Sequence, residues 1–324
     1  MRIGVNPEKN KGDNNIYYYH RIIIPVYIPS ETGFYEESIL ILKKCLDSVV
    51  NTINHNTTKI TVVNNSSYEK VTWLLENYFK NKLIEKLVTY SENKGKVFAV
   101  ISEAKASYEP YITIMDADIL LFSGWEIAVM DIFQNFSKAG AVAPLPLPNL
   151  CFHKNSSVFF HEYFFGNIGY DKIVSEESCN LYLKGMGNDA LLRRNNRKYS
   201  WRDKQYFLKG KSPALLGCGH FVATYRKEIF KGIVKFPERK FINGYEESFL
   251  DDKVDMIGLY RLSTVKTYAY HMGNKLDMVG DENPSHYSKV SEEIFHWLKP
   301  ARSSGIPYSL RKLVFRFLKR IRNL

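Results

Sequence analysis

Two aspartates separated by one residue, Asp116 and Asp118, follow the apolar run YITIM at residues 111–115. A short run of β-branched and large apolar residues is typical of a buried strand. Two carboxylates at the end of one strand repel each other unless a cation lies between them. Mg²⁺ and Mn²⁺ prefer carboxylate oxygens and commonly keep substrate phosphates as further ligands. The pair therefore predicts a divalent-cation site for a phosphorylated substrate, whereas an isolated D-x-D indicates only a solvated turn.

A second group of carboxylates, Glu246, Glu247, Asp251 and Asp252, lies in the segment INGYEESFLDDKV at 242–254. Acidic side chains favour the first turn of a helix, where they face the positive end of its dipole. A carboxylate beside a substrate hydroxyl can instead act as a general base, because a hydroxyl is a poor nucleophile at neutral pH. Adjacent acids raise one another's pKa, which suits a base. The residues alone favour the first interpretation.

Other polar side chains could assist such chemistry, but each also has an ordinary structural interpretation. His271, in the segment YHMGN, could give a cation an imidazole ligand or be a hydrogen-bonded histidine before a turn. Lys94 and Lys96 flank Gly95 and could face a phosphate, although a solvated surface position is commoner for lysine. The residues alone leave both alternatives open.

The first 150 residues alternate between strand-like and helix-like segments. β-Branched runs predict strands, and apolar residues three or four positions apart predict helices. Ser123 to Glu126 has the pattern of a capping box and predicts the start of a further helix. This alternation favours a mainly parallel central sheet with helices on both faces, whose ligands bind beyond the carboxyl ends of the strands. The predicted strands are 21–29, 59–65, 86–91 and 111–115, and the predicted helices are 36–51, 67–81 and 96–107.

The pattern weakens after residue 150. Residues 151–212 mix aromatic residues, Asn, Lys and Gly without a clear period, so no element is predicted there. Segments with a clearer pattern return at 214–230 and 241–254.

Seven segments resemble, in their order and spacing, the GT-A glycosyltransferases, most closely the inverting glycosyltransferase family 2. The similarity runs from about residue 21 to residue 274. The segments are IIIPVY (22–27), TVVNNSS (61–67), ENKGKVFAV (92–100), IMDADI (114–119), GCGHFVATYRKEIF (217–230), INGYEESFLDDKV (242–254) and YHMGN (270–274).

The resemblance implies a GT-A (nucleotide-diphospho-sugar transferase) fold and a metal-dependent, inverting hexosyl- or N-acetylhexosaminyltransferase. It further implies a UDP- or GDP-sugar donor, a glycan or lipid-linked saccharide acceptor, and Mn²⁺ or Mg²⁺ as cofactor. Asp118, Asp116 and His271 would ligate the metal, and Glu247 would be the catalytic base with Glu246 as the alternative. The residues implied at the donor are Pro25, Tyr27, Asn64, Asn65, Asn93, Gly95, Asp116, Ala117, Asp118 and Gly219.

The sequence departs from the family pattern in the donor and base segments. Asn64 and Asn65 stand where the family usually has an aspartate, so a contact to the base or ribose there would be uncharged. Glu247 stands where the family has aspartate, and its side chain is longer by one methylene. The resemblance also places Gly217 and Arg226 near the donor.

The resemblance divides the chain into four regions. Residues 1–20 are a lead-in, and residues 21–150 form the nucleotide-sugar-binding subdomain. Residues 151–275 form the acceptor-binding and catalytic-base subdomain. Residues 276–324 form a C-terminal helical region with a basic amphipathic tail.

The net charge of +11 favours a polyanionic partner without selecting one. No nucleic-acid fold signature occurs, so nucleic acid is not an expected partner. A sugar-phosphate nucleotidyltransferase would need a glycine-rich loop after the first strand, and PVYIPSETGFYEES at 25–38 does not provide one. A non-catalytic carbohydrate- or membrane-binding protein on a degenerate transferase fold remains the alternative.

The sequence carries no pattern for export or membrane spanning. Its first residues, MRIGVNPEKNKGDNN, lack the apolar core of a signal peptide, and no apolar run approaches about 18 residues. No two cysteines form a C-x-x-C pair, which indicates free buried thiols in a reducing compartment. We therefore expect a cytoplasmic protein. The cysteines are Cys45, Cys151, Cys179 and Cys218.

The C-terminal segment from Leu310 predicts an amphipathic helix whose polar face is basic and free of acids. Such a helix can lie in an anionic membrane interface, whereas packing on the domain is the ordinary alternative. We expect peripheral association with the inner face of the cytoplasmic membrane, beside lipid-linked acceptors. The apolar residues are Leu310, Leu313, Val314, Phe317, Leu318, Ile321 and Leu324, and the basic residues are Arg311, Lys312, Arg316, Lys319, Arg320 and Arg322.

Overall fold

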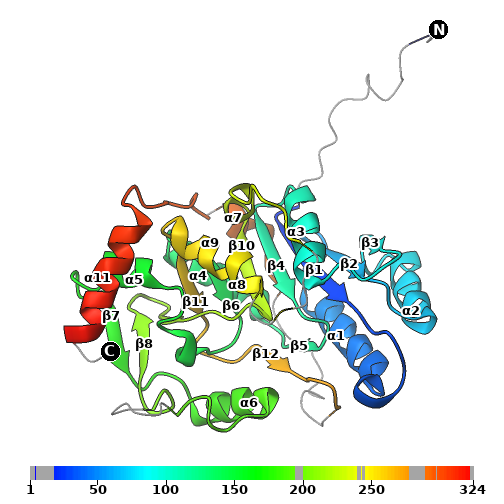
Figure 1. The fold of residues 1–324 in the computed structure, drawn as a ribbon, viewed down its shortest axis with the longest axis horizontal. Coiled ribbons are helices and arrows are strands. Elements are labelled where there is room, and N and C mark those ends of the chain that lie inside the picture. Colours follow the sequence, from blue (N-terminus) through cyan, green and yellow to red (C-terminus); the bar gives the residue numbers. More distant parts are fainter. Residues whose placement is uncertain are drawn as a thin grey trace.

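The computed structural model describes residue 4 and residues 18–193, 200–238, 242, 245–276, 289–296 and 298–321. A ten-stranded sheet runs through the molecule in the order β3-β2-β1-β4-β10-β6-β11-β9-β8-β7, with helices packed around it (Figure 1). The α/β class predicted from the alternation of strands and helices is confirmed. Most of the predicted lead-in at 1–20 and part of the C-terminal region, residues 277–288, lie outside the described residues.

Four parallel strands form one half of the sheet and confirm the strands predicted from β-branched runs. In β1, residues 22–24 are fully buried, because helices cover both faces of this half. β1 lies between β2 and β4, with Ile22 opposite both Ile60 and Thr113. Since parallel strands end at the same edge, the polar residues that follow them come together there. The strands are β1 (His20–Val26), β2 (Thr58–Asn64), β3 (Lys86–Thr89) and β4 (Tyr111–Met115).

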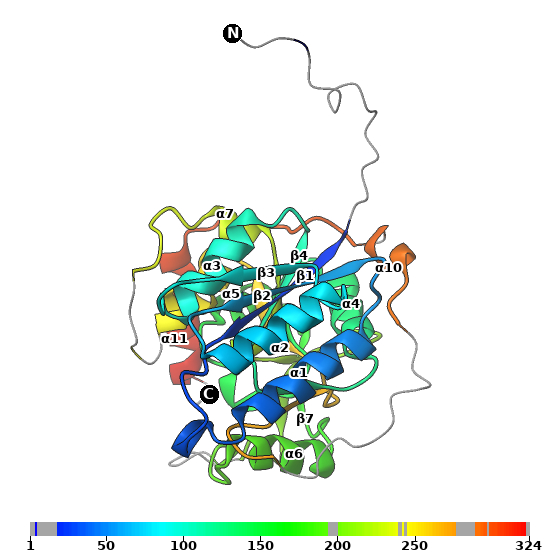
Figure 2. The ribbon, with the colours of Figure 1, turned by 90° about the vertical axis from the view of Figure 1, so that its right-hand side faces the viewer.

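Four helices flank this half of the sheet, and their apolar residues fall at helical spacing as predicted. In Figure 2, α3 lies on one side of the strands and α1 and α2 lie on the other. Cys45 is buried on α1, and the other three cysteines are also buried and unbridged, as expected. The helices are α1 (Ser38–Thr52), α2 (Glu69–Lys80), α3 (Lys96–Ala106) and α4 (Trp125–Asn135).

The second half of the sheet contains mostly antiparallel pairings. β10 (Val222–Arg226) lies antiparallel between β4 and β6 (Ala139–Ala143), so one sheet crosses the boundary predicted at residue 150. The division into subdomains stays a prediction. The remaining strands of this sheet are β11 (Tyr260–Ser263), β9 (Ala214–Leu216), β8 (Gln205–Leu208) and β7 (Ile168–Asp171).

Several further helices connect or flank these strands. They are η2 (Gly33–Tyr35), η3 (Pro148–Leu150), α5 (Ser156–Glu162), α6 (Glu176–Met186), α7 (Glu228–Lys231), α8 (Tyr245–Phe249), α9 (Asp251–Met256) and α10 (Glu292–His296).

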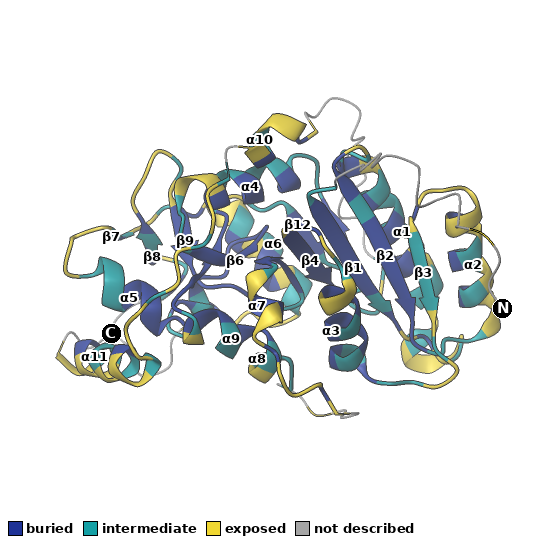
Figure 3. Ribbon diagram, turned by 90° about the horizontal axis from the view of Figure 1, so that it is seen from above, coloured by how far each residue is buried: buried dark blue, intermediate teal, exposed yellow. Residues whose placement is uncertain are grey.

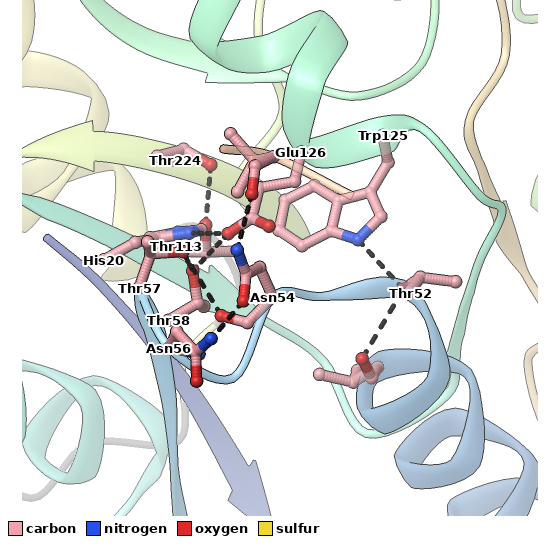
Figure 4. Close-up of polar contacts among 12 residues, drawn as sticks. His20, Thr52, Asn54, Asn56, Thr57, Thr58, Thr113, Trp125, Glu126 and Thr224 are labelled. Atoms are coloured by element: carbon pink, nitrogen blue, oxygen red, sulfur yellow. Dashed lines mark hydrogen bonds and ion pairs between the residues drawn. The ribbon is translucent and has the colours of Figure 1, made fainter. Parts of the chain in front are cut away.

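Glu126 does not cap α4, so the capping box predicted from Ser123 is wrong. Gly124 is the N-cap residue, with a left-handed φ of 83°, and no side chain caps the helix. The Glu126 carboxylate is buried instead, where it accepts a hydrogen bond from Thr58 and lies 2.7 Å from His20 Nδ1 (Figure 4). This polar network joins α4 to the beginnings of β1 and β2. The carboxylate needs these partners, because a carboxylate buried without them would be strongly destabilising.

The predicted C-terminal amphipathic helix is present as α11 (Tyr308–Ile321) and packs against α5. The Phe315 ring lies 5.1 Å from the Phe159 ring, measured between centroids. Arg311 does not belong to the solvated basic face predicted for it. It is buried, and its guanidinium donates hydrogen bonds to the backbone carbonyls of residues 255 and 256.

The outer side of α11 is exposed to solvent along its length (Figure 3). Leu310, Leu313, Phe317 and Ile321 are exposed there, although the sequence grouped them with the buried Leu318. Arg322 and Leu324 of the predicted helix lie outside the described residues. Within the part of the chain that the structure describes, no helix has both the length and the apolar character to cross a membrane.

Candidate active site

A cavity of about 760 Å³ lies beyond the carboxyl ends of the parallel strands, where ligands of such sheets bind. It receives residues from the ends of β1, β2 and β4, from α6, and from residues 271–275. The lining residues include Pro25, Tyr27, Ile28, Phe34, Tyr35, Asn65, Asn93, Lys96, Asp116, Ala117, Asp118, Lys184, Gly185, Met186, Gly187, His271 and Asn274.

The aspartate motif forms the turn between β4 and the short strand β5 (Ile119–Leu121). β5 pairs antiparallel with β12 (Ala269–His271), and this pairing places His271 opposite Ile119. The Met272 N–H donates a hydrogen bond to the Asp118 carbonyl oxygen at 2.9 Å, just beyond the paired residues. Backbone pairing therefore brings the two predicted ligands Asp118 and His271 together from distant parts of the chain.

Asp118 and His271 face each other in the cavity, with 3.3 Å between Oδ2 and Nε2. The other carboxylate oxygen of Asp118, Oδ1, is buried and has no hydrogen-bond partner in the protein. Burial raises the pKa of Asp118 above its ordinary value, and nearby Asp116 adds to this effect while His271 opposes it. A buried carboxylate with an unpaired oxygen beside an imidazole is suited to a cation.

Asp116 makes a different contact from Asp118. Its Oδ1 lies 2.5 Å from the Nζ of Lys96, the first residue of α3. The same ammonium lies 3.6 Å from Oε1 of Glu246. Burial favours the neutral amine, but the carboxylates of Asp116, Glu246 and Asp118 outweigh it and raise the pKa of Lys96. The lysine is therefore a cation within the cavity.

Lys94, on the other side of Gly95, lies at the surface, which is the commoner position for a lysine. Lys94 forms an ion pair with Glu92 at the surface, 2.5 Å away. Of the two lysines that the sequence could not separate, Lys96 alone lines the cavity among the residues described.

The predicted donor residues Asn65, Asn93 and Gly95 form one hydrogen-bonded unit. Asn65 donates to Asn93 Oδ1 at 2.8 Å and accepts from the Lys94 N–H at 2.8 Å. Gly95 has a φ of 87° and donates its N–H to Asn93 Oδ1 at 2.9 Å. The two amides fix the loop that leads into α3, and both line the cavity.

Asn64, Gly219, Gly217 and Arg226 do not enter the cavity. Asn64 is the buried last residue of β2, where its amide donates a hydrogen bond to Thr72 and accepts one from the N–H of residue 67. Gly219 lies against the side chains of residues 147 and 221. Gly217 has a φ of 128°, and a Cβ there would lie 2.3 Å from the carbonyl oxygen of residue 147.

Arg226 lies at the opposite end of the sheet from the cavity. It is the last residue of β10 and pairs with Tyr111 at the start of β4. Its guanidinium donates to the Tyr111 hydroxyl at 3.1 Å and to the carbonyl oxygen of Ala139 at 2.7 Å. Because β10 runs antiparallel to β4, a residue at its carboxyl end is far from the aspartate motif.

The two candidate bases on α8 face different neighbours. Glu246 points to Lys96, as described above. Glu247 Oε2 lies 3.5 Å from Nε2 of His153, which follows η3 in the segment without predicted elements. Gly244 of the segment at 242–254 lies outside the described residues. The geometry thus separates the two glutamates that the sequence leaves as alternatives.

Asp251 belongs to a buried ion-pair network. Its carboxylate contacts Arg261 at 2.9 Å and His220 at 3.2 Å. Burial disfavours the charged form, but Arg261 and the contacts from His153 and His220 outweigh it and hold the pKa of Asp251 well below its usual range. Asp252 instead pairs with Lys154 at 2.7 Å in a partly exposed position. Asp251 therefore has a structural role behind α8.

No sequence pattern predicts the C-terminal turn of α6, which lines the cavity. Figure 1 shows α6 beside β12, and Gly185 makes this packing possible. A Cβ at Gly185 would lie 2.9 Å from the carbonyl oxygen of His271. The Gly185 carbonyl oxygen lies 3.0 Å from His271 Nδ1. In the sequence, Gly185 is only a small residue in a segment without periodicity, so this packing could not be predicted.

Comparison with known proteins identifies the family of this chain. The model of glycosyl transferase family 2 matches residues 22–233, which is more than half of the chain. The chain belongs to glycosyl transferase family 2. The family match also confirms the GT-A fold class expected from the motifs. No curated protein sequence matches this chain.

Several solved structures resemble this chain at low sequence identity. Mannosyltransferase PcManGT from Pyrobaculum calidifontis, solved with GDP-Man and Mn²⁺, has 13% identity and a TM-score of 0.43 over 78% of this chain and 55% of its own. S. aureus TarS 1–349, solved with UDP-GlcNAc, has 13% identity and a TM-score of 0.47 over 93% and 72%. GalNAc-T7, solved with UDP, GalNAc and Mn²⁺, has 13% identity and a TM-score of 0.47 over 80% of this chain and 44% of its own. This chain thus spans about half the length of the first and the last of these structures.

The predicted metal ligands of this chain do not form a complete site by themselves. Within the described ranges, no three His, Cys, Asp or Glu side chains are arranged to hold a metal. Asp118 and His271 converge, whereas Asp116 contacts Lys96. Mn²⁺ accepts a carboxylate oxygen and an imidazole nitrogen, and substrate phosphates commonly complete its shell. With the unpaired oxygen of Asp118, these residues fit a cation shared with a substrate.

Proposed function

We propose that this glycosyltransferase transfers a hexosyl or N-acetylhexosaminyl group from a UDP- or GDP-sugar to a hydroxyl of a glycan or lipid-linked saccharide. The observation that carries the proposal is the convergence of Asp118 and His271 in a cavity beyond the carboxyl ends of parallel strands. Asp118 and His271 would hold Mn²⁺ or Mg²⁺, and Asp116 would bind the cation through water or reach the donor ribose. The cation would offset the charge that develops on the departing nucleoside diphosphate.

The nucleoside would lie against the ends of β1 and β2. Tyr27 lines the cavity with an exposed ring, and Pro25 adds an apolar surface next to it. Asn65 and Asn93 would contact the base or ribose without charge. Each amide is already engaged in the loop before α3, so this wall is held in place before a nucleoside binds.

Glu247 is the proposed general base. It would take the proton of the acceptor hydroxyl while that oxygen attacks the anomeric carbon, and the bond from this carbon to the phosphate oxygen would break. Because the acceptor and the nucleoside diphosphate occupy opposite faces of the sugar, the anomeric configuration would invert. Glu246 is the less suitable base, because its carboxylate already faces the ammonium of Lys96, with 3.6 Å between Oε1 and Nζ.

A lipid-linked acceptor requires the enzyme to work at a membrane surface, and α11 provides a suitable face. Three sectors follow one another around this helix. The buried sector holds Arg311, Phe315 and Leu318 against the domain, with Leu318 in the core. The opposite side carries the exposed apolar stripe of residues 310, 313, 317 and 321. A basic sector lies beside the stripe and contains Lys312, Arg316, Lys319 and Arg320.

We therefore propose that α11 attaches the enzyme peripherally to an anionic cytoplasmic membrane. The helix is docked on α5 through its inner side, so its outer stripe has no other described surface to cover it. An apolar stripe flanked by cations matches a headgroup region, where acyl chains accept the apolar side chains and anionic lipids attract the cations.

A donor screen tests the proposed function. Nucleotide-sugars are added with and without Mn²⁺, and the melting temperature and the release of nucleoside diphosphate are measured. A true donor should stabilise the folded protein in the presence of Mn²⁺ and should be turned over. Binding of a saccharide without turnover of any donor would favour the non-catalytic alternative.

A further inference from the structure

Two lysines at almost the same place in the sequence have opposite environments. Lys94 and Lys96 flank Gly95, and Gly95 is the N-cap residue of α3. Lys94 contacts Glu92 at the surface, 2.5 Å away. Lys96 reaches into the cavity and contacts Asp116.

The contacts of Lys96 join the two sides of the proposed reaction. Asp116 belongs to the motif that would face the cation and the donor, and its Oδ1 lies 2.5 Å from the ammonium. Glu246 belongs to the helix that carries the proposed base, and its Oε1 lies 3.6 Å from the same ammonium. Asp118 adds further negative charge nearby. One cation of the protein therefore balances three carboxylates, two from the aspartate motif and one from α8.

A divalent cation at Asp118 would compete with this ammonium for Asp116. Two positive charges a few ångströms apart repel each other, so each lowers the affinity of the site for the other. A diphosphate reverses this effect, because its several negative charges can accept the cation and the ammonium at the same time. Binding of the cation and of the diphosphate is then coupled, and coupling between two ligands is reciprocal.

We propose that Lys96 makes cation binding depend on the donor. While it contacts Asp116, it weakens the binding of a divalent cation alone. When a nucleoside diphosphate binds with the cation, the ammonium turns from Asp116 to the diphosphate, and Asp116 becomes available to the cation. This inference rests on the proposed function and assigns a positioning role to Lys96.

Binding measurements without turnover test the inference. Calorimetry gives the Kd of Mn²⁺ alone and then the Kd of UDP and of GDP in saturating Mn²⁺, for the wild type and for Lys96→Met. We expect the variant to bind Mn²⁺ alone about tenfold more tightly and its preferred nucleoside diphosphate about tenfold more weakly. Lys96→Arg keeps the charge and should restore both values towards those of the wild type.

Lys94→Met is the matched control, because it removes a lysine two residues away that does not line the cavity. It should leave both Kd values within about twofold of the wild type. A loosened or misfolded Lys96→Met site would weaken both ligands, whereas the inference requires changes of opposite sign. Weakening of both, or no change in either, overturns it.

The same measurements separate this inference from the proposed function. Mn²⁺ and nucleoside diphosphate binding to the wild type with no effect of Lys96→Met would contradict the role of Lys96 alone. No Mn²⁺ binding to the wild type, with or without a nucleoside diphosphate, would overturn the metal site of the proposed function and this inference with it.

Discussion

His271 is oriented by Gly185, because its Nδ1 lies 3.0 Å from the Gly185 carbonyl oxygen. A carbonyl oxygen only accepts hydrogen bonds, so Nδ1 is the donor in this contact and Nε2 is the ring nitrogen that could meet a cation. Nε2 is the atom that faces Asp118. A backbone carbonyl behind the ring is a common support for a metal-ligating histidine. The proposed ligand therefore depends on α6 as well as on its own strand.

Gly185→Ala should disturb this support. The added Cβ would lie 2.9 Å from the His271 carbonyl oxygen, so α6 and β12 must move apart. We expect a loss of about 1–3 kcal/mol in the free energy of unfolding. We also expect at least about tenfold weaker binding of Mn²⁺ in the presence of a nucleoside diphosphate.

Gly232→Ala is the control for that change. Gly232 has a φ of −77°, and the nearest atom to an added Cβ is 3.9 Å away. This variant should keep wild-type Mn²⁺ binding, measured by calorimetry. Equal Mn²⁺ affinity in Gly185→Ala and the wild type would show that α6 does not support His271.

The first half of the fold was accessible from sequence because its information is local. Each of β1, β2 and β4 is a continuous apolar run, and parallel strands buried on both faces require such runs. The edge at which Asp116 and Asp118 lie follows from that topology. α6 was not accessible, since its position depends on the close approach of Gly185 to β12, and long-range packing leaves no period in the chain.

Glu247→Gln should leave donor binding intact while lowering kcat by about a hundredfold or more, because an amide cannot accept the acceptor proton. The measurement is the rate of nucleoside diphosphate release at saturating donor and acceptor, together with the donor Kd. Glu246→Gln should have a smaller effect on kcat. If Glu246→Gln causes the larger loss instead, the assignment of the two glutamates is reversed.

Asp251→Asn should destabilise the protein by roughly 3–5 kcal/mol, because it leaves Arg261 charged and buried without its partner. Asp252→Asn removes a partly exposed pair with Lys154 and should cost about 1 kcal/mol or less. Urea unfolding of both variants measures the difference. Similar losses in the two variants would contradict the structural role of Asp251.

The same network predicts a pH dependence. The pKa of Asp251 is lower in the folded protein than its unfolded value of about 4. Its stabilising contribution is therefore fully present above that pH and is lost as the pH falls towards the folded pKa. The stability difference between the wild type and Asp251→Asn should shrink below about pH 4, as unfolding at several pH values would show.

The sequence grouped Asp251 with Glu246 and Glu247 because all three are acids in one short segment. The structure separates them by partner, since Asp251 faces Arg261 and Glu246 faces Lys96. Partners from other elements decide whether a carboxylate is structural or chemical. Arg311 shows the same dependence on distant partners. Helical periodicity predicted a solvated face for it, whereas its guanidinium is buried and donates hydrogen bonds to backbone carbonyls of α9.

Leu313→Ser with Phe317→Ser should reduce binding to anionic liposomes by at least about tenfold without unfolding the enzyme, because both side chains are exposed on α11. Co-sedimentation at low and high salt measures binding, and neutral liposomes are the lipid control. Wild-type binding should weaken as salt rises, since the basic sector contributes electrostatically. Equal sedimentation of the variant and the wild type would rule out α11 as the attachment site.

The most direct test of the account is the release of nucleoside diphosphate from UDP- and GDP-sugars with Mn²⁺, compared between the wild type and Asp118→Ala. The wild type should turn over at least one donor, and the variant should lose more than about tenfold in rate because the cation loses its principal ligand. A variant that keeps more than about a tenth of the wild-type rate would contradict the metal site at Asp118 and His271.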